Sequence, residues 1–123
     1  MQCVLKRFLE IAKEKQKRDD EKRVKIMFRN HKQIFYLDEI LYLESRAHRT
    51  MIHTYEGEEV CHDKIADLEQ RMGENFVRCH QSFLVNMKYI RQIENESFKL
   101  ENGEEISISK RRYVKTKEQY FQY

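Results

Sequence analysis

Four short polar clusters interrupt the apolar runs of this sequence, and they hold the side chains best suited to binding chemistry. Arginine and lysine bind phosphate oxygens, and a glutamine can form two hydrogen bonds with adenine in the major groove of DNA. One cluster alone is equally consistent with a solvated loop, whereas four on one small domain favour a nucleic-acid-binding surface. The clusters are Ser45-Arg46-Ala47-His48-Arg49-Thr50, His80-Gln81-Ser82, Asn86-Met87-Lys88 and Lys110-Arg111-Arg112.

Enzymatic and metal-binding motifs do not occur in the sequence. It contains no glycine-rich phosphate loop, nucleophile elbow, H-E-x-x-H or C-x-x-C motif. Two Cys-His dipeptides have the residue types of zinc ligands, but neighbouring side chains of a strand point to opposite faces. We therefore predict no catalytic residues, no metal and no cofactor. Cys79 is expected to be a buried thiol, and the alternative is a redox-responsive thiol whose pKa is lowered by Arg78.

Net charge alone does not predict a nucleic-acid partner. The chain of 123 residues carries a net charge of +3, and residues 1–23 hold eight Lys or Arg against five Asp or Glu, which accounts for all of it. Residues 106–123 hold five basic residues against Glu118. DNA-binding domains usually show a basic patch on one face. Any contact with nucleic acid must therefore depend on a few well-placed basic side chains.

The length and the cysteines bound the number of domains and the cellular setting. A chain of 123 residues allows one domain. No apolar run approaches the roughly 18 residues that a membrane span needs, and Lys6 and Arg7 interrupt the stretch where a secretion signal would be apolar. Three cysteines cannot all pair within one chain, which favours a reducing, cytoplasmic setting.

The polar clusters are separated by segments that predict a mainly β fold. Runs rich in Ile, Phe, Tyr and Thr recur from Lys25 onward and indicate a β-meander. Asn102-Gly103 predicts a hairpin with a type I′ turn. One helix is expected after Asp63 or His62 as N-cap, ending at Gly73, and another after Ser109. Residues 80–90 fit either a strand or a helical turn.

The N-terminal segment has a different pattern from the rest of the chain. Apolar residues follow helical spacing only as far as Ala12, and a charged tail comes next. Residues 1–23 therefore predict an amphipathic helix and a charged linker, which would serve as a surface helix, a dimer contact or a basic arm on DNA. The apolar residues are Val4, Leu5, Phe8, Leu9, Ile11 and Ala12.

Residues 76–93 resemble the signature segment of the LytTR family, F-x-R-x-H-x-S-[FY]-x-V-N-x-x-x-I-x-x-I. Upstream, ILYLES resembles a strand of that family, and downstream the Asn102-Gly103 hairpin and ISKRR resemble its last strand and basic end. The similarity covers about residues 24–117. The signature positions are filled by Phe76, Arg78, His80, Ser82, Phe83, Val85, Asn86, Ile90 and Ile93.

The resemblance implies a transcriptional regulator whose residues 24–123 form the DNA-binding domain. Its fold would be an elongated arrangement of small antiparallel sheets with short helices, with loops in successive major grooves of duplex DNA. Two copies would bind imperfect direct repeats in promoters. Most relatives carry a receiver domain upstream, controlled by a sensor kinase, and residues 1–22 resemble only the closing helix and linker of a receiver. Either the receiver is missing here or the regulator stands alone.

The same resemblance implies roles for individual residues. His48 would contact a base or phosphate from the first loop, Gln81 would read a base, and Arg111 would contact DNA from the last loop. Asn86, like His80, would serve equally well as a buried polar group bonded to backbone. Contacts mostly to phosphate are expected of Arg46, Arg49, Ser82, Asn86, Lys88 and Lys110.

Two other functional classes fit the sequence. A protein-interaction or dimerisation module would use the β edges and the N-terminal helix without direct DNA readout. An RNA-binding β domain would stack bases on exposed aromatic residues, but Phe28, Phe35 and Tyr36 lie in strongly apolar runs and are expected in the core.

Overall fold

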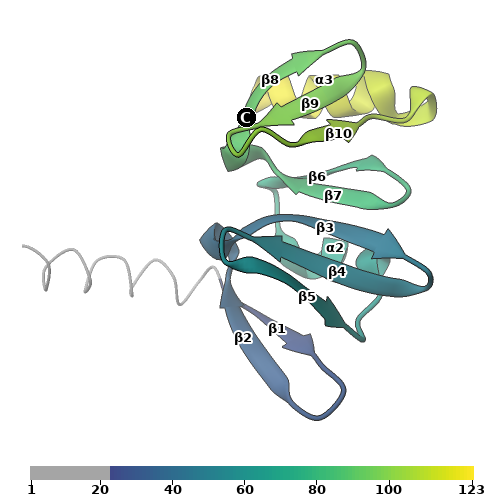
Figure 1. The fold of residues 1–123 in the computed structure, drawn as a ribbon. Helices are drawn as coiled ribbons and strands as arrows, with labels where there is room; N and C mark the ends of the chain where they lie inside the picture. Colours follow the sequence, from purple (N-terminus) through teal and green to yellow (C-terminus); the bar gives the residue numbers. More distant parts are fainter. Residues whose placement is uncertain (1–22) are drawn as a thin grey trace, which may run out of the picture.

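The computed structural model describes residues 23–123, which form three small antiparallel sheets and two helices (Figure 1). The first sheet pairs β1 (Arg23–Met27) with β2 (Lys32–Tyr36). The central sheet has the order β5-β4-β3-β7-β6, and the third has the order β10-β9-β8. The sheets follow one another along the long axis of the domain, so the predicted mainly β, elongated fold is confirmed.

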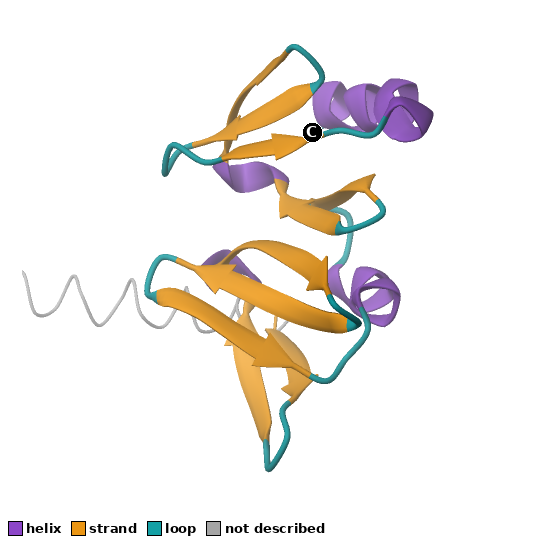
Figure 2. Ribbon diagram, turned by 45° about the vertical axis from the view of Figure 1, so that its right-hand side comes forward, coloured by secondary structure: helices purple, strands orange, loops and turns teal. Residues whose placement is uncertain are grey.

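Within the central sheet, hairpins join β3 to β4, β4 to β5 and β6 to β7, and helix α2 connects β5 to β6. Central-sheet bounds are β3 (Ile40–Arg46), β4 (Arg49–Thr54), β5 (Gly57–Cys61), β6 (Phe76–His80) and β7 (Phe83–Asn86). The third sheet consists of β8 (Ile90–Glu94), β9 (Ser97–Leu100) and β10 (Glu105–Ser107). Helices α2 (Ile65–Met72) and α3 (Tyr113–Gln122) both pack against β6 (Figure 2). Single 3-10 turns are η1 (Leu37–Glu39), η2 (Met87–Tyr89) and η3 (Lys110–Arg112).

Two hydrophobic cores lie on opposite faces of the central sheet. Leu84 of β7 belongs to the core that β1, β2 and α2 cover, whereas Val85 belongs to the core under β8, β9 and β10. Neighbouring residues of a strand point to opposite faces, so a strand that is apolar at consecutive positions is buried on both sides. The run of apolar residues from Ile40 to Leu43 has the same cause, since all four are buried.

Two local predictions need correction, and one open alternative is resolved. Asp63 does not cap α2, whose N-cap is Lys64, because the Asp63 carboxylate accepts from Met27 N at 2.9 Å and pairs with Arg71 at 3.1 Å. Residues 80–90 contain both alternatives, since β7 is followed by η2 and β8. The Asn102-Gly103 turn is not type I′, which requires positive φ at both central residues. Of this pair only Gly103 has positive φ, and its N donates to Leu100 O at 3.0 Å.

Other sequence predictions stand differently. Ser109 precedes the last helical segment as predicted, but its hydroxyl makes no capping hydrogen bond. The amphipathic helix predicted in residues 1–23 lies almost entirely outside the described residues, and Arg23 itself begins β1. Across residues 23–123, no helix is both long and apolar enough to cross a bilayer.

Candidate nucleic-acid interface

The turn between β3 and β4 presents His48 at the tip of a hairpin. Arg46 pairs with Arg49 across the hairpin, which leaves only Ala47 and His48 in the turn. Their φ values are 52° and 66°, so both residues adopt the left-handed conformation of a type I′ turn. Neither is glycine, and a left-handed residue with a Cβ carries a strain of about 1–3 kcal/mol. His48 and Arg49 are exposed at this strained position.

The turn between β6 and β7 lies beside the first one. Ser45 N donates to Ser82 O at 2.8 Å, which joins the two turns by a backbone hydrogen bond. His48, Gln81 and Ser82 line one shallow hollow of about 380 Å³, together with the exposed side chain of Lys64. The structure therefore brings together two clusters that are 33 residues apart in sequence, counting from His48 to Gln81.

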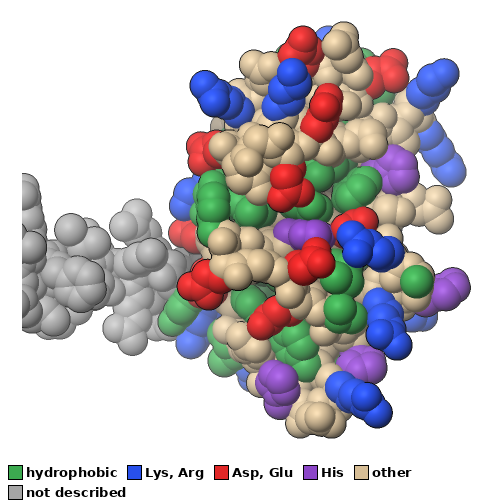
Figure 3. All heavy atoms as spheres, in the orientation of Figure 1, with side chains coloured by type: hydrophobic (Ala, Val, Ile, Leu, Met, Phe, Trp, Pro, Cys, Tyr) green, Lys and Arg blue, Asp and Glu red, His purple; other side chains and the backbone are tan. Residues whose placement is uncertain are grey.

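The third basic segment, η3, lies on the same edge of the domain. Ser109 N donates to Cys79 O at 2.9 Å, which attaches the start of η3 to β6. Lys110 and Arg111 follow directly and are exposed. The β3–β4 turn, the β6–β7 turn and the connection from β10 to α3 all lie on the right-hand edge of Figure 1, where Lys, Arg and His side chains gather in Figure 3. We call these three segments the basic edge.

Arg46 is exposed on the basic edge but is held by a carboxylate. Its guanidinium donates to Glu44 at 2.8 Å and 3.3 Å. Glu44 also bonds Nε2 of His53 at 3.0 Å, and His53 stacks on Tyr42 with ring centroids 4.1 Å apart. Arg46 therefore belongs to a side-chain network that runs back along the sheet, whereas no comparable network reaches Arg49 among the described interactions.

Asn86 and Lys88, which the sequence analysis expected to contact DNA, lie away from the basic edge. The Asn86 side chain is 2% exposed, donates to Leu37 O and Ile40 O, and accepts from Lys88 N. A buried amide with all these partners is a structural group. Lys88 is at the other end of β7 from the β6–β7 turn, and its ammonium pairs with Asp38 at 3.4 Å. The structural alternative for Asn86 is therefore favoured.

His80 and Arg78 support the β6–β7 turn from within. Nδ1 of His80 accepts a hydrogen bond from Ser82 N at 3.0 Å, as the structural alternative for His80 predicts. Arg78, which the sequence analysis named as a signature position and as a neighbour of Cys79 but not as a site residue, donates to both His80 O and Gln81 O. Lys64 was also missed. Its place beside the turn depends on the fold of α2 against β6, for which the sequence carries no local signal.

The Cys79 thiol is enclosed in the second core. Burial raises its pKa to about 12, and its Sγ lies 3.6 Å from Ser107 O. The guanidinium of Arg78 is occupied at the turn, so the redox alternative lacks the accessible, acidic thiol that it requires. Cys61 is also a buried free thiol. Within residues 23–123, no group of three His, Cys, Asp or Glu side chains is arranged to hold a metal ion.

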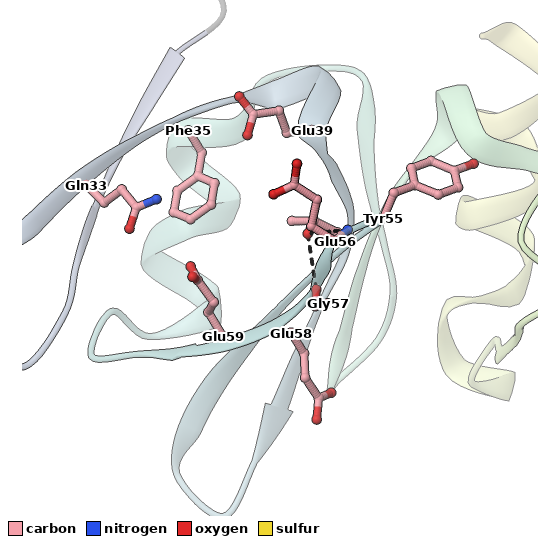
Figure 4. A pocket seen from close by; sticks show the side chains of 9 residues that line it. Gln33, Phe35, Glu39, Tyr55, Glu56, Gly57, Glu58 and Glu59 are labelled. Carbon is pink, nitrogen blue, oxygen red and sulfur yellow. Dashed lines mark hydrogen bonds between the residues drawn. The ribbon is translucent and has the colours of Figure 1, made fainter.

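Carboxylates gather at the end of β4 remote from the basic edge. A groove of about 490 Å³ between β2 and the β4–β5 hairpin is lined by Glu39, Glu56, Glu58 and Glu59 around Phe35 (Figure 4). The six residues of β4 separate this groove from the β3–β4 turn. Phosphate groups are repelled by the carboxylates at this end of the domain and attracted by the cationic side chains of the basic edge.

The domain is thus a mainly β module of small antiparallel sheets that carries basic and amide side chains on adjacent turns of one edge. The chain belongs to the LytTR DNA-binding domain family, whose model matches residues 30–120. This is a family of non-enzymatic DNA-binding domains, and membership implies a transcriptional regulator.

Two similar proteins agree with this assignment. The fold is similar to that of a solved LytTr DNA-binding domain from Bacillus cereus, with a TM-score of 0.67, 21% identity, and coverage of 83% of this chain and 98% of that one. A segment of 53 residues, 42% of this chain, is 34% identical to the CO-responsive transcriptional regulator RcoM of Rhodospirillum rubrum. That segment spans 22% of the length of RcoM.

Proposed function

We propose that residues 24–123 bind duplex DNA with sequence preference and read the major groove with the turns of the basic edge. The observation that carries this proposal is the convergence of His48, Gln81 and Arg111, from three separate connections, on one edge. Imidazole, amide and guanidinium groups are the side chains that form hydrogen bonds with base edges. His48 and Gln81 share one hollow, which suits contacts to neighbouring base pairs.

Phosphate contacts belong to the residues around these three. Arg49, Ser82 and Lys110 flank the reading side chains and fit contacts with the DNA backbone, as does Arg46 once it leaves Glu44. Phosphate contacts fix the register of a protein on DNA but carry no sequence information. Of the DNA-binding residues expected from the sequence, we leave Asn86 and Lys88 out of this proposal, because both lie away from the basic edge.

The proposal includes a regulatory setting in a bacterial cytoplasm. This domain acts as the output domain of a two-component response regulator, under a receiver domain and a sensor kinase, and two copies bind imperfect direct repeats in promoters. Membership of the LytTR family supports a role in transcription. The RcoM relative, whose name records a response to CO, supports the coupling of such a domain to a sensory input.

A selection experiment tests the proposed function. Duplexes selected from a random library by the purified protein should converge on one motif, and a gel-shift series should show tighter binding to that motif than to random duplexes. Binding should weaken steeply with salt, because neutralised phosphates release counterions. Equal affinity for all sequences, or no binding even at low salt, would overturn the proposal and favour the protein-interaction alternative.

A further inference from the structure

Arg78 occupies an irregularity in β6 immediately before the β6–β7 turn. Val77 pairs with Val85 and His80 pairs with Phe83, so two residues of β6 lie opposite Leu84 alone. Such a bulge redirects a side chain relative to a regular strand. The guanidinium of Arg78 is consequently placed under the turn that carries Gln81.

All three nitrogens of this guanidinium are occupied within the protein. Nε donates to His80 O at 3.1 Å, Nη2 donates to Gln81 O at 2.6 Å, and Nη1 donates to Glu69 Oε1 at 2.7 Å. The side chain of Arg78 is only 12% exposed, and Glu69 on α2 balances its charge. Nη1 and Nη2 each keep one further N–H, but a side chain this buried exposes little of its guanidinium to DNA.

The turn is fixed from several directions at once. Arg78 binds its first two carbonyls, the His80 ring binds the amide of Ser82, and Ser45 binds the carbonyl of Ser82. The Gln81 side chain itself is exposed and lines the hollow beside His48. A side chain on a fixed backbone loses less conformational freedom when it binds a base.

We propose that Arg78 is a positioning residue for sequence readout, which holds the β6–β7 turn in the conformation that presents Gln81 to a base without touching DNA. The inference rests on the proposed function and deepens it. Lysine at this position would keep the charge but could not span two carbonyls and a carboxylate with one ammonium in the geometry of the planar guanidinium.

The test compares Arg78→Lys with Arg71→Lys, which makes the same change on α2. Arg71 also donates to a backbone carbonyl, that of Lys25 in β1, and pairs with Asp63, but none of its described bonds reaches the β6–β7 turn. Arg78→Lys should lower affinity for the selected motif about tenfold, leave affinity for random duplexes within about twofold and leave the salt slope unchanged. Arg71→Lys should change none of the three.

A double-mutant cycle with Gln81→Ala separates positioning from an independent contact. If Arg78 acts through Gln81, the double variant should bind the selected motif no more weakly than Gln81→Ala alone. Losses of affinity that add in the double variant would overturn the inference. Equal losses on the selected motif and on random DNA, with a reduced salt slope, would also overturn it, because they would identify Arg78 as a phosphate contact. No effect of Arg78→Lys would also overturn it.

Glu69→Gln keeps the inference testable if Arg78→Lys does not fold. Removal of a negative charge near DNA should by itself strengthen binding to every duplex. A drop confined to the selected motif can therefore come only from a loosened Arg78, and stronger binding to all DNA would overturn the inference. If the wild-type protein prefers no DNA sequence, the proposed function is refuted, and the inference fails with it. If the wild-type protein does prefer one sequence but the losses of the two variants add, only the inference is refuted.

Discussion

At the scale of single residues, Arg111 and Lys110 are neighbours with different expected roles. Both are exposed in η3 at the start of the last helical segment. Arg111→Ala should reduce affinity for the preferred motif by about 1–3 kcal/mol more than affinity for random DNA, because a bidentate base contact discriminates by that amount. Lys110→Ala should weaken both equally and reduce the salt slope by about one charge. Titrations of both variants on both duplexes at two salt concentrations check this, and identical behaviour would make η3 an electrostatic anchor only.

Glu44 restrains an arginine on the basic edge. Because its carboxylate holds the Arg46 guanidinium at 2.8 Å, Glu44→Gln should release that guanidinium toward phosphate. Affinity for random duplexes should rise about two- to fivefold, with a salt slope steeper by up to one charge. Glu58→Gln is the matched control, since Glu58 faces the other ring nitrogen of His53 at 3.4 Å and attracts Arg46 only through space, without a hydrogen bond. An equal effect of both variants would show that net charge alone matters.

The Cys79 thiol should be inert in the folded protein. Burial raises its pKa from the ordinary value of 9.0 to about 12, so the fold favours the neutral thiol. The stability that this preference contributes is complete below pH 9 and is lost as the pH rises from there toward 12. Iodoacetamide at pH 8 should label Cys79 only after denaturation, as mass spectrometry of digests would report. Rapid labelling of the native protein would contradict the buried-thiol assignment.

At the scale of elements, the β3–β4 hairpin exposes His48 at its tip in a backbone conformation that lowers the stability of the fold. His48→Gly should raise the free energy of unfolding by about 1 kcal/mol, because glycine adopts φ near 66° without the strain that a Cβ brings. The same change should lower affinity for the selected motif, since the imidazole is lost. Chemical denaturation and gel shifts on one preparation measure both effects. Loss of stability would show that the His48 side chain supports the fold.

Sequence reasoning located the strands and the Asn102-Gly103 hairpin but assigned the wrong type to that turn. Apolar runs predicted the buried segments of β3 and β7, because the residue types of a short segment are enough to indicate that it is buried. The type I′ geometry expected at Asn102-Gly103 occurs instead at Ala47-His48 and Asn95-Glu96, where φ is positive at both positions without glycine. Packing of whole strands overrides the local preference of a turn there.

The residues of the candidate site also divide into those that the sequence predicted and those that only the structure shows. His48, Gln81 and Arg111 came from the resemblance, and their placement on one edge agrees with the proposed role without testing it. The structural role of Arg78 depends on a bulge and on a carboxylate nine positions earlier, which no spacing rule connects. The outward basic groups and the backbone-bonded His80 were therefore visible in the sequence, whereas the supporting role of Arg78 was visible only in the fold.

At the scale of the whole molecule, the domain should unfold as one unit although it has two cores. Leu84 and Val85 of β7 belong to different cores, so loss of either core exposes the same strand. Backbone amides of β3 and β7 should be the slowest to exchange with deuterium, because they open only when both cores do. Exchange measured by NMR under native conditions tests this. Faster exchange in β7 than in β9 would indicate two independently unfolding halves.

A strand shared by two cores also limits how evolution can rearrange this domain. A recombination breakpoint between β7 and β8 would expose Val77 and Val85 to solvent on the N-terminal fragment. On the C-terminal fragment it would remove the side chains that cover Phe98. The N-terminal fragment keeps the core that β1, β2 and α2 cover but exposes the other face of its central sheet, and the C-terminal fragment loses the strands that close its core. We therefore expect duplication, fusion or exchange to succeed only when the segment from β1 to α3 is transferred intact. The three sheets are thus one heritable unit, free to be joined to different sensory partners but not to be divided among them.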